Sequence, residues 1–191
     1  MINSRSDLII AEQSRDVTAL VAALTTGDPS WRSLAMGALH RLDALTTEQL
    51  RSGLTDKDRN VRIRAIEIAI GTPAIDLAPL LNDPDDLVVE SAAWAMGERE
   101  DSDASGVSAL CAIATKHEVS ICREAAIAAL GAIGSPDGLP AILAGLDDRA
   151  PVRRRAVLAL APFDGPEVSA ALLKATSDRD RQVRQAAEDL L

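Results

Sequence analysis

Aromatic residues are nearly absent from this chain of 191 residues. It has no tyrosine, and its only aromatic side chains are Trp31, Trp94 and Phe163. Nearly half of the residues are nevertheless apolar, and alanine and leucine dominate among them. A β-sheet protein would be expected to use more aromatic and β-branched residues, whereas alanine and leucine favour helices that approach one another closely. The composition therefore predicts an all-α fold.

The chain also lacks an excess of positive charge, long apolar runs and a set of cysteines. Its formal net charge of −9 argues against general binding to nucleic acid or to an anionic membrane, since both need clustered lysine and arginine. The first ten residues contain only three consecutive apolar residues, and no apolar run approaches the roughly 20 residues of a membrane span. Cys111 and Cys122 are too few for a disulfide framework and are expected to be free thiols. These absences predict a cytoplasmic protein without membrane contact.

A repeated pattern occupies most of the sequence. An apolar anchor is followed by arginine, then by alanine at +4 and by small or aliphatic residues at +7 and +8, which is the buried stripe of an amphipathic helix. The anchors are spaced by 30, 27, 34, 30 and 31 residues, and they are Trp31, Val61, Val88, Cys122, Val152 and Val183. The +4 alanines are Ala35, Ala65, Ala92, Ala126, Ala156 and Ala187. We expect these alanines to be buried where neighbouring helices meet, because a larger side chain would overpack the position.

A shorter apolar segment precedes each anchor helix, so each repeat is predicted to be a helix pair. The segments are roughly 17–24, 47–54, 75–81, 107–114, 139–146 and 168–175. Thr46 and Pro166 are typical of helix starts. Acidic turns such as 56–58 join the two helices, and an aspartate there can cap the second helix. The second helices are expected to end at Gly71, Gly97, Gly131 and Gly134.

The repeats predict one domain over residues 1–191, with residues 1–14 as an N-terminal capping segment. The six predicted helix pairs occupy about 15–45, 46–73, 74–100, 104–134, 135–164 and 165–191.

The pattern D-x-x-V-R-x-x-A, from Asp58 to Ala65 and again from Asp180 to Ala187, resembles HEAT repeats. Residues 91–98 (SAAWAMGE) are similar to the second helix of a short subtype often called phycobilisome-lyase-like. The resemblance covers about residues 15–191 and implies a right-handed α-solenoid, an armadillo-like helical stack with its second helices on the concave side. The third copy departs from the pattern with Val89 in place of arginine, and the fourth and fifth have Val119 and Arg149 in place of aspartate. Such repeats serve many unrelated tasks, so the resemblance implies a fold more than a function.

Catalytic chemistry finds little support in the sequence. It has no glycine-rich phosphate loop and no arrangement of a nucleophile with a histidine base. Deoxyhypusine hydroxylase is a HEAT-repeat enzyme that holds iron with several His-Glu pairs, whereas this chain has only His117-Glu118 and a lone His40. We therefore predict that the protein is not an enzyme, that it needs no cofactor, and that it has no catalytic, cofactor-binding or metal-binding residues.

A binding surface is predicted on the second helices, at offsets +2, +3 and +6 from the anchors, because these offsets lie away from the buried stripe. Trp94 stands at +6, where the other copies have smaller or charged residues, so the repeat itself does not require an aromatic residue there. An exposed tryptophan flanked by acids suits a binding hot spot, although it could instead pack onto the next helix. The predicted partner-binding residues are Trp94, Glu90, Glu98, Arg64, Glu67, Glu124 and Leu158.

The charge around Trp94 indicates what kind of partner to expect. Residues 82–104 contain eight acids and a single base, Arg99. An acidic groove with one aromatic anchor favours a basic protein or peptide, so we predict a non-catalytic scaffold that binds such a partner on its concave surface.

Other functions remain open at the level of sequence. Arginine-rich rows in repeats five and six could contact phosphates, as in HEAT-like DNA-repair proteins, but stacking aromatics are missing nearby and the chain is acidic. Those rows could equally mediate self-association, and a third alternative is an enzyme-associated protein of the phycobilin-lyase type. The recurrent Arg32, Arg62, Arg123, Arg153 and Arg184 could form a ligand-binding row. We interpret them instead as ties between neighbouring repeats, through aspartates or carbonyls, because their spacing follows the repeat.

Overall fold

The computed structural model describes residues 4–25, 28–99 and 104–191, and every regular element within these ranges is a helix. The predicted all-α fold is therefore confirmed, with helix pairs stacked as in an α-solenoid. The chain divides into two compact units, Met1–Asp76 and Leu77–Leu191. Among the described residues, none of the helices combines the length and apolarity needed to cross a membrane.

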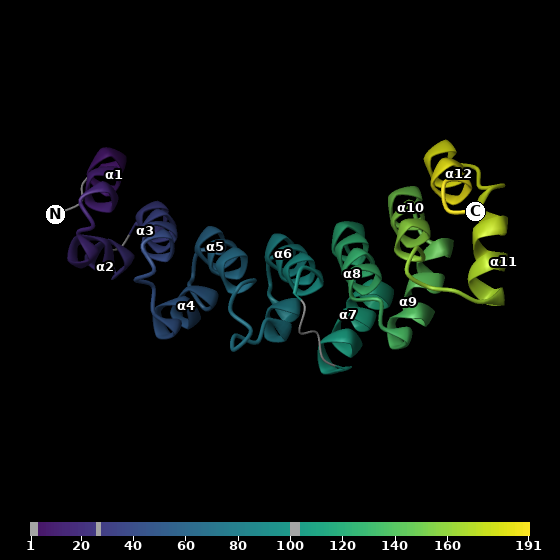
Figure 1. Cartoon of the computed structure of the whole chain (residues 1–191), viewed down its shortest axis with the longest axis horizontal. Coiled ribbons are helices and arrows are strands. Elements are labelled where there is room, and N and C mark those ends of the chain that lie inside the picture. Colours follow the sequence, from purple (N-terminus) through teal and green to yellow (C-terminus); the bar gives the residue numbers. More distant parts are fainter. Residues whose placement is uncertain (1–3, 26–27, 100–103) are drawn as a thin grey trace. The chain divides into compact units, whose positions relative to one another are not determined.

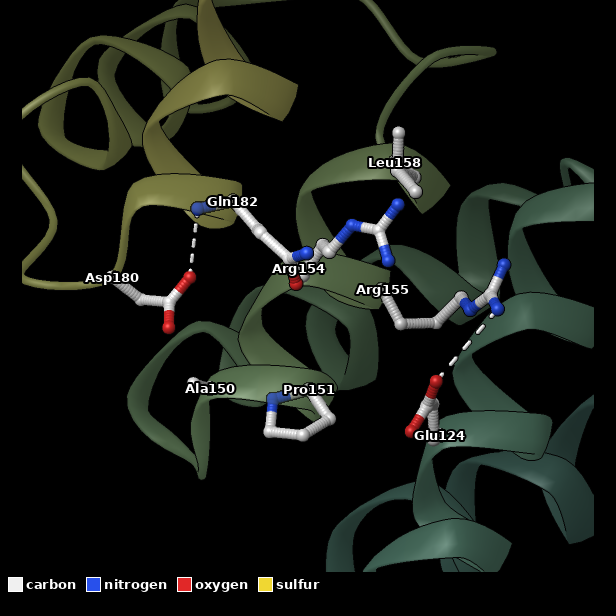
Figure 2. A pocket seen from close by; sticks show the side chains of 8 residues that line it. All are labelled: Glu124, Ala150, Pro151, Arg154, Arg155, Leu158, Asp180 and Gln182. Carbon is white, nitrogen blue, oxygen red and sulfur yellow. Dashed lines mark hydrogen bonds and ion pairs between the residues drawn. The ribbon is translucent and has the colours of Figure 1, made fainter.

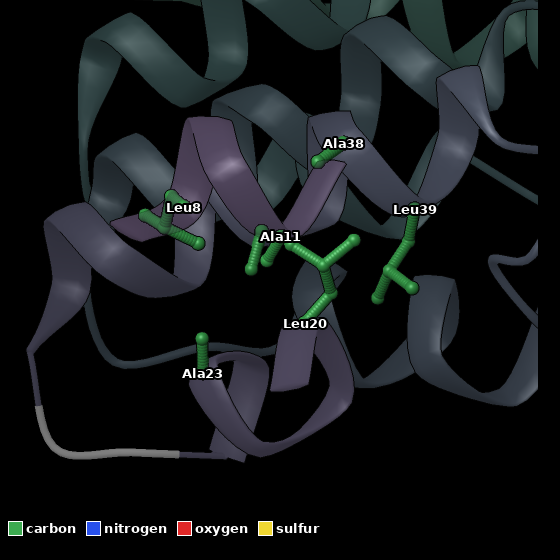
Figure 3. Packing of buried hydrophobic residues seen from close by; sticks show 7 residues of the cluster. Leu8, Ala11, Leu20, Ala23, Ala38 and Leu39 are labelled. Carbon is green, nitrogen blue, oxygen red and sulfur yellow. The ribbon is translucent and has the colours of Figure 1, made fainter. Parts of the chain in front are cut away.

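The first unit contains repeats one and two and an additional N-terminal helix. Its helices are α1 (Arg5–Gln13), α2 (Val17–Thr25), α3 (Pro29–Arg41), α4 (Thr47–Leu54) and α5 (Arg59–Ala69). Leu8 and Ala11 of α1 pack with Leu20 of α2 and Leu39 of α3 in a buried cluster (Figure 3). Helix α1 thereby covers the apolar side of the first helix pair. Thr46 is the N-cap of α4, which confirms the helix start predicted there, and it forms a capping box with Gln49.

The second unit contains repeats three to six. Its elements are η1 (Ala78–Asn82), α6 (Asp86–Gly97), α7 (Ala104–Lys116), α8 (Ser120–Ile133), η2 (Pro136–Gly138), α9 (Leu139–Ala144), η3 (Gly145–Asp147), α10 (Ala150–Ala159), α11 (Pro166–Ala175) and α12 (Arg181–Glu188). Within this unit α6 packs on α8, α8 on α10, and α10 on α12, so the second helices form a row (Figure 1). The first segment of repeat three is a short 3₁₀ helix around Pro79, in place of an α-helix.

The six +4 alanines are completely buried, which confirms the register of the repeat. Aspartate caps also lie where the sequence placed them, since Asp58, Asp85 and Asp180 each accept a hydrogen bond from the backbone N–H two residues later. The N-cap residues of α8 and α10 are Val119 and Arg149, and neither makes a side-chain cap hydrogen bond, as the departures in repeats four and five implied.

Two glycines have a role that the sequence did not reveal. Gly134 ends α8 with a left-handed φ of 66°, as predicted. Gly131, however, lies inside α8, so its expected role as a helix end is wrong. A Cβ on Gly131 would stand 2.7 Å from the Cα of Ala159 in α10, and a Cβ on Gly97 would stand equally close to the Cα of Ala129 in α8. Both glycines therefore let neighbouring second helices approach closely.

Arginine–aspartate pairs tie successive repeats together within each unit. Arg32 donates two hydrogen bonds of 2.7 Å to Asp56 of the next repeat. Arg123 and Arg153 make the same bidentate contact, and the pairs are Arg123–Asp148 at 2.6 and 2.8 Å and Arg153–Asp178 at 2.8 Å. A further N–H of each of these two arginines, and one of Arg184, donates to a backbone carbonyl in the turn that precedes its own helix. For these pairs, the interpretation of the recurrent arginines as inter-repeat ties is confirmed.

The tie between repeats three and four has a different chemistry. Val89, which is buried, replaces the arginine of repeat three. In repeat four, His117 replaces the aspartate of the turn, because its Nδ1 accepts from the Val119 N–H as Asp56 and Asp178 accept from the N–H groups two residues after them. The two substitutions therefore match each other. With His117 in place of the aspartate, the turn offers no carboxylate to which an arginine at position 89 could donate.

Candidate functional site

Trp94 is the largest exposed apolar side chain on the second helices of unit two. It lies on α6 with 48% of its surface exposed, on the face opposite to the buried Ala92 and Ala95. It lines a hollow of about 480 Å³ between α6 and α8, which we call the Trp94 groove. The groove is lined by Glu90, Trp94, Gly97, Glu98, Ile121, Glu124, Ala125, Ala128, Ala129, Ala132 and Arg155. The structure therefore favours the exposed position for Trp94 over the packed alternative.

The groove exists because small residues form its floor. Helices α6 and α8 approach closely where Gly97 meets Ala129. Ala125, Ala128 and Ala132 on the facing side of α8 lack the bulk to fill the space beside the indole ring. Interiors normally leave little unfilled volume between packed helices, so this hollow is a feature of the surface and not of the core.

Acidic side chains dominate the charge of the Trp94 groove, with three glutamates against one arginine. Burial raises the pKa of Glu90, and the nearby negative charge of Glu124 raises it further. Glu124 has a partial partner in Arg155, whose guanidinium lies 3.7 Å from its carboxylate. Within the described ranges, Glu90 has neither an ion-pair nor a hydrogen-bond partner for its side chain. Its charge is therefore poorly compensated by the protein itself.

A smaller hollow of about 130 Å³ adjoins the groove on its α10 side, and we call it the Arg154 hollow. Its lining residues are Glu124, Ala150, Pro151, Arg154, Arg155, Leu158, Asp180 and Gln182. Figure 2 shows Arg155 reaching to Glu124 on α8, while the side chain of Gln182 extends from α12 toward Arg154. The Glu124–Arg155 pair belongs to the lining of both hollows and so stands at their boundary.

The structure brings together four of the seven predicted partner-binding residues. Glu90, Trp94, Glu98 and Glu124 line the same groove, and Leu158 lines the adjacent hollow with 38% of its surface exposed. The two remaining residues lie on α5 of unit one, where Arg64 and Glu67 form an ion pair of 2.8 Å with each other. The guanidinium of Arg64 occupies the space beside Gly37 on α3, which any side chain at position 37 would fill.

Sequence reasoning missed Ile121, and it placed Arg154 and Arg155 in an arginine-rich row and not among the partner-binding residues. The two arginines stand at offsets +2 and +3 from Val152, so the rule that selected Glu124 could also have found them. Ile121 stands at −1, where the repeat pattern gives no signal, yet 41% of its surface is exposed at the groove.

The arginine-rich rows offer less free charge than the sequence indicated. Arg153 is buried and fully engaged by Asp178 and by the carbonyl of Asp148. Arg184 donates to the carbonyl of Asp178, and Arg155 faces Glu124. These contacts remove three arginines from any continuous row that could follow a phosphate backbone.

Asp86, His117 and Cys122 form a cluster that the sequence did not bring together, with one potential metal-ligand atom of each within 4.8 Å of the others. The hydrogen bonds do not favour a metal there. The Nδ1 of His117 accepts from the Val119 N–H, so in the neutral ring the Nε2 that faces Asp86 carries the proton. Burial raises the pKa of Cys122 to about 11, and its thiol donates to the carbonyl of Asp86. A metal ligand would instead need a free nitrogen lone pair and a thiolate.

Comparisons with known proteins agree on the fold. A sequence model of HEAT repeats matches residues 74–161 and, in an overlapping match, residues 107–191. The search of curated proteins found no match. Among solved structures, the chain is similar to an engineered protein from the Northeast Structural Genomics Consortium, with a TM-score of 0.67 and 24% identity over 92% of this chain and 95% of that one. It is also similar to a designed armadillo repeat protein, with a TM-score of 0.56 and 18% identity over 92% and 98% of the two chains.

Proposed function

Because this chain belongs to the HEAT-repeat family, we propose that it is a protein-interaction module whose binding surface is the Trp94 groove. HEAT and armadillo repeats present rows of second helices that typically serve as scaffolds for other proteins. Folds of this kind are typical of non-enzymatic proteins, and we assign the chain to that class. The proposal places the contact on the α6–α8 side of the second-helix row, with Leu158 at its edge.

One observation carries the proposal, namely the half-exposed Trp94 beside an unfilled hollow. A large aromatic side chain at this place contributes little to the stability of the repeat, because the equivalent position holds glycine, alanine or a charged residue in four other copies. Tryptophan is among the residues that contribute most to binding energy when a partner covers them. A hollow lined by alanine next to such a ring leaves room for a side chain of the partner.

The test is a comparison of two truncations in the same unit. A partner is first identified by affinity purification with cross-linking, and its affinity is then measured by calorimetry. Trp94→Ala should weaken binding by about 2 kcal/mol, a loss of roughly thirtyfold. The control is Leu173→Ala on α11, which removes an apolar side chain with 66% exposure from a first helix.

Circular dichroism and thermal unfolding should show that both variants fold as the wild type does. Full affinity of a folded Trp94→Ala protein would contradict the proposal. An equal loss in both variants would point to a general effect of surface apolarity.

A further inference from the structure

We propose that the natural occupant is an extended segment of a partner protein with two opposite charges, a basic side chain in the Trp94 groove and an acidic side chain at Arg154. This inference rests on the proposed function and narrows it to a partner of defined charge pattern.

The basic side chain of the partner is proposed because negative charge is in excess beside Trp94. Glu90 is half-buried and Glu124 adds a second carboxylate within electrostatic range, so the two glutamates repel each other across the groove. An arginine or lysine of the partner, placed between the two carboxylates, would replace this repulsion by attraction to its positive charge. Its cationic head could also lie over the face of the Trp94 indole, an arrangement that is favourable for tryptophan above all other rings.

The acidic side chain of the partner is proposed to pair with Arg154. This arginine is exposed, and within residues 4–25, 28–99 and 104–191 no carboxylate pairs with it. The two carboxylates of the Arg154 hollow make other contacts, because Glu124 lies 3.7 Å from Arg155 and Asp180 accepts hydrogen bonds from the N–H groups of Gln182 and Val183 at the start of α12. A partner carboxylate could therefore pair with the guanidinium of Arg154, because a guanidinium can donate two parallel hydrogen bonds to a carboxylate.

The positions of the two hollows set the spacing of the charges. Both lie along the row of second helices, and they share Glu124 and Arg155 as their boundary. Trp94 lies on α6 and Arg154 on α10, with α8 between them, so two helix spacings of about 10 Å each separate these residues. An extended chain advances roughly 3.3 Å per residue. The basic and acidic residues of the segment should therefore be separated by about six positions. Opposite charges at the two ends would also fix the direction in which the segment lies.

The probe for this inference is a library of random linear peptides displayed on phage and selected against the folded, full-length chain. The selected peptides should be enriched in arginine or lysine with aspartate or glutamate about six residues away. For a selected peptide, the double variant Glu90→Gln, Glu124→Gln should weaken binding about tenfold or more. Arg154→Glu should give a comparable loss, and a new selection on that variant should replace the acidic residue by a basic one.

Matched controls lie on the first helix of repeat six. Glu167→Gln removes an exposed carboxylate from α11, and Lys174→Glu reverses an exposed cation there. Neither should change the affinity of a selected peptide. Each variant is checked by circular dichroism before its affinity is measured.

The possible outcomes separate the two proposals. Selected peptides that need Trp94 but lack the charge pair, or that ignore the glutamate and Arg154 variants, would overturn this inference and leave the Trp94 groove as a binding surface. Selected peptides that bind Trp94→Ala as tightly as the wild type would overturn both. A library that yields no binding peptide would overturn the inference, because an extended segment with this pattern is represented in it.

Discussion

Gly97 of α6 packs on Ala129 of α8 so closely that a Cβ on the glycine would stand 2.7 Å from the Cα of the alanine. The obstacle is backbone, which cannot turn aside as a flexible side chain would. Gly97→Ala should therefore push α6 away from α8 and destabilise the protein by about 1–3 kcal/mol, as overpacking does. The measurement is the free energy of unfolding in urea.

Gly71→Ala provides the control for this substitution. Nothing lies within 4 Å of the Cβ that the change would add, and the backbone of Gly71 does not need a positive φ. We expect its effect to be neutral or slightly stabilising. Equal stability of the two variants would show that the close contact between α6 and α8 is absent in solution.

Ala126→Glu should unfold repeat four or destabilise it by several kcal/mol, because it would bury an unpaired carboxylate between α8 and its neighbours. The control Ala112→Glu places the same side chain on an exposed position of α7. Thermal unfolding of both variants checks the expectation. A melting temperature of Ala126→Glu within a degree or two of the wild type would mean that the repeat register is wrong.

Asp178→Asn should cost roughly 3–5 kcal/mol at neutral pH, because it leaves the buried guanidinium of Arg153 without its counter-ion. The control is Asp147→Asn, since the Asp147–Lys174 pair is 3.6 Å long with both side chains 80% exposed and should contribute less than about 1 kcal/mol.

The same pair predicts how stability depends on pH. The hydrogen bonds from Arg153 lower the pKa of Asp178 in the folded chain. A lowered folded pKa gives stability that is complete above the unfolded value of about 3.9 and is lost as pH falls through the folded value. The difference in unfolding free energy between the wild type and Asp178→Asn should therefore shrink below about pH 4. A difference that stays constant down to pH 2 would contradict the assigned role.

Both cysteines should be free thiols of unequal reactivity. Cys122 is completely buried and burial raises its pKa to about 11, whereas Cys111 is partly exposed. A thiol reagent at pH 8 should label Cys111 first and Cys122 only on unfolding. Mass spectrometry of the native protein would contradict this by finding a Cys111–Cys122 disulfide or stoichiometric zinc.

The sequence was sufficient for the fold because the features of a repeat are local. Ala65 or Ala126 recurs at a fixed distance from its anchor, and an aspartate such as Asp58 caps a helix two residues away. Each of these signals can be read within one turn of helix. Periodicity then multiplies the evidence, so the register of all six second helices could be predicted.

The site was less accessible because it depends on contacts between repeats. The groove requires that Gly97 touch Ala129, which is 32 positions away, and no local pattern encodes that contact. The pairing of Arg155 with Glu124 likewise joins two helices whose separate offsets gave no hint of an ion pair. Trp94 could be found in advance only because it breaks the pattern of its own position.

The replacement of a charged tie by Val89 and His117 has a consequence for acid conditions. In unit two, the junctions of repeats four with five and five with six each depend on an aspartate whose charge is lost in acid. The junction of repeats three and four depends mainly on apolar packing and on the approach of two helices at a glycine, and protonation alters neither. Its contact between His117 and Asp86 is 3.8 Å long with the Asp86 side chain 53% exposed, so it contributes little. Acid should therefore loosen the C-terminal repeats first. The Trp94 groove would then be the part of this unit that keeps its shape longest as the surroundings turn acidic.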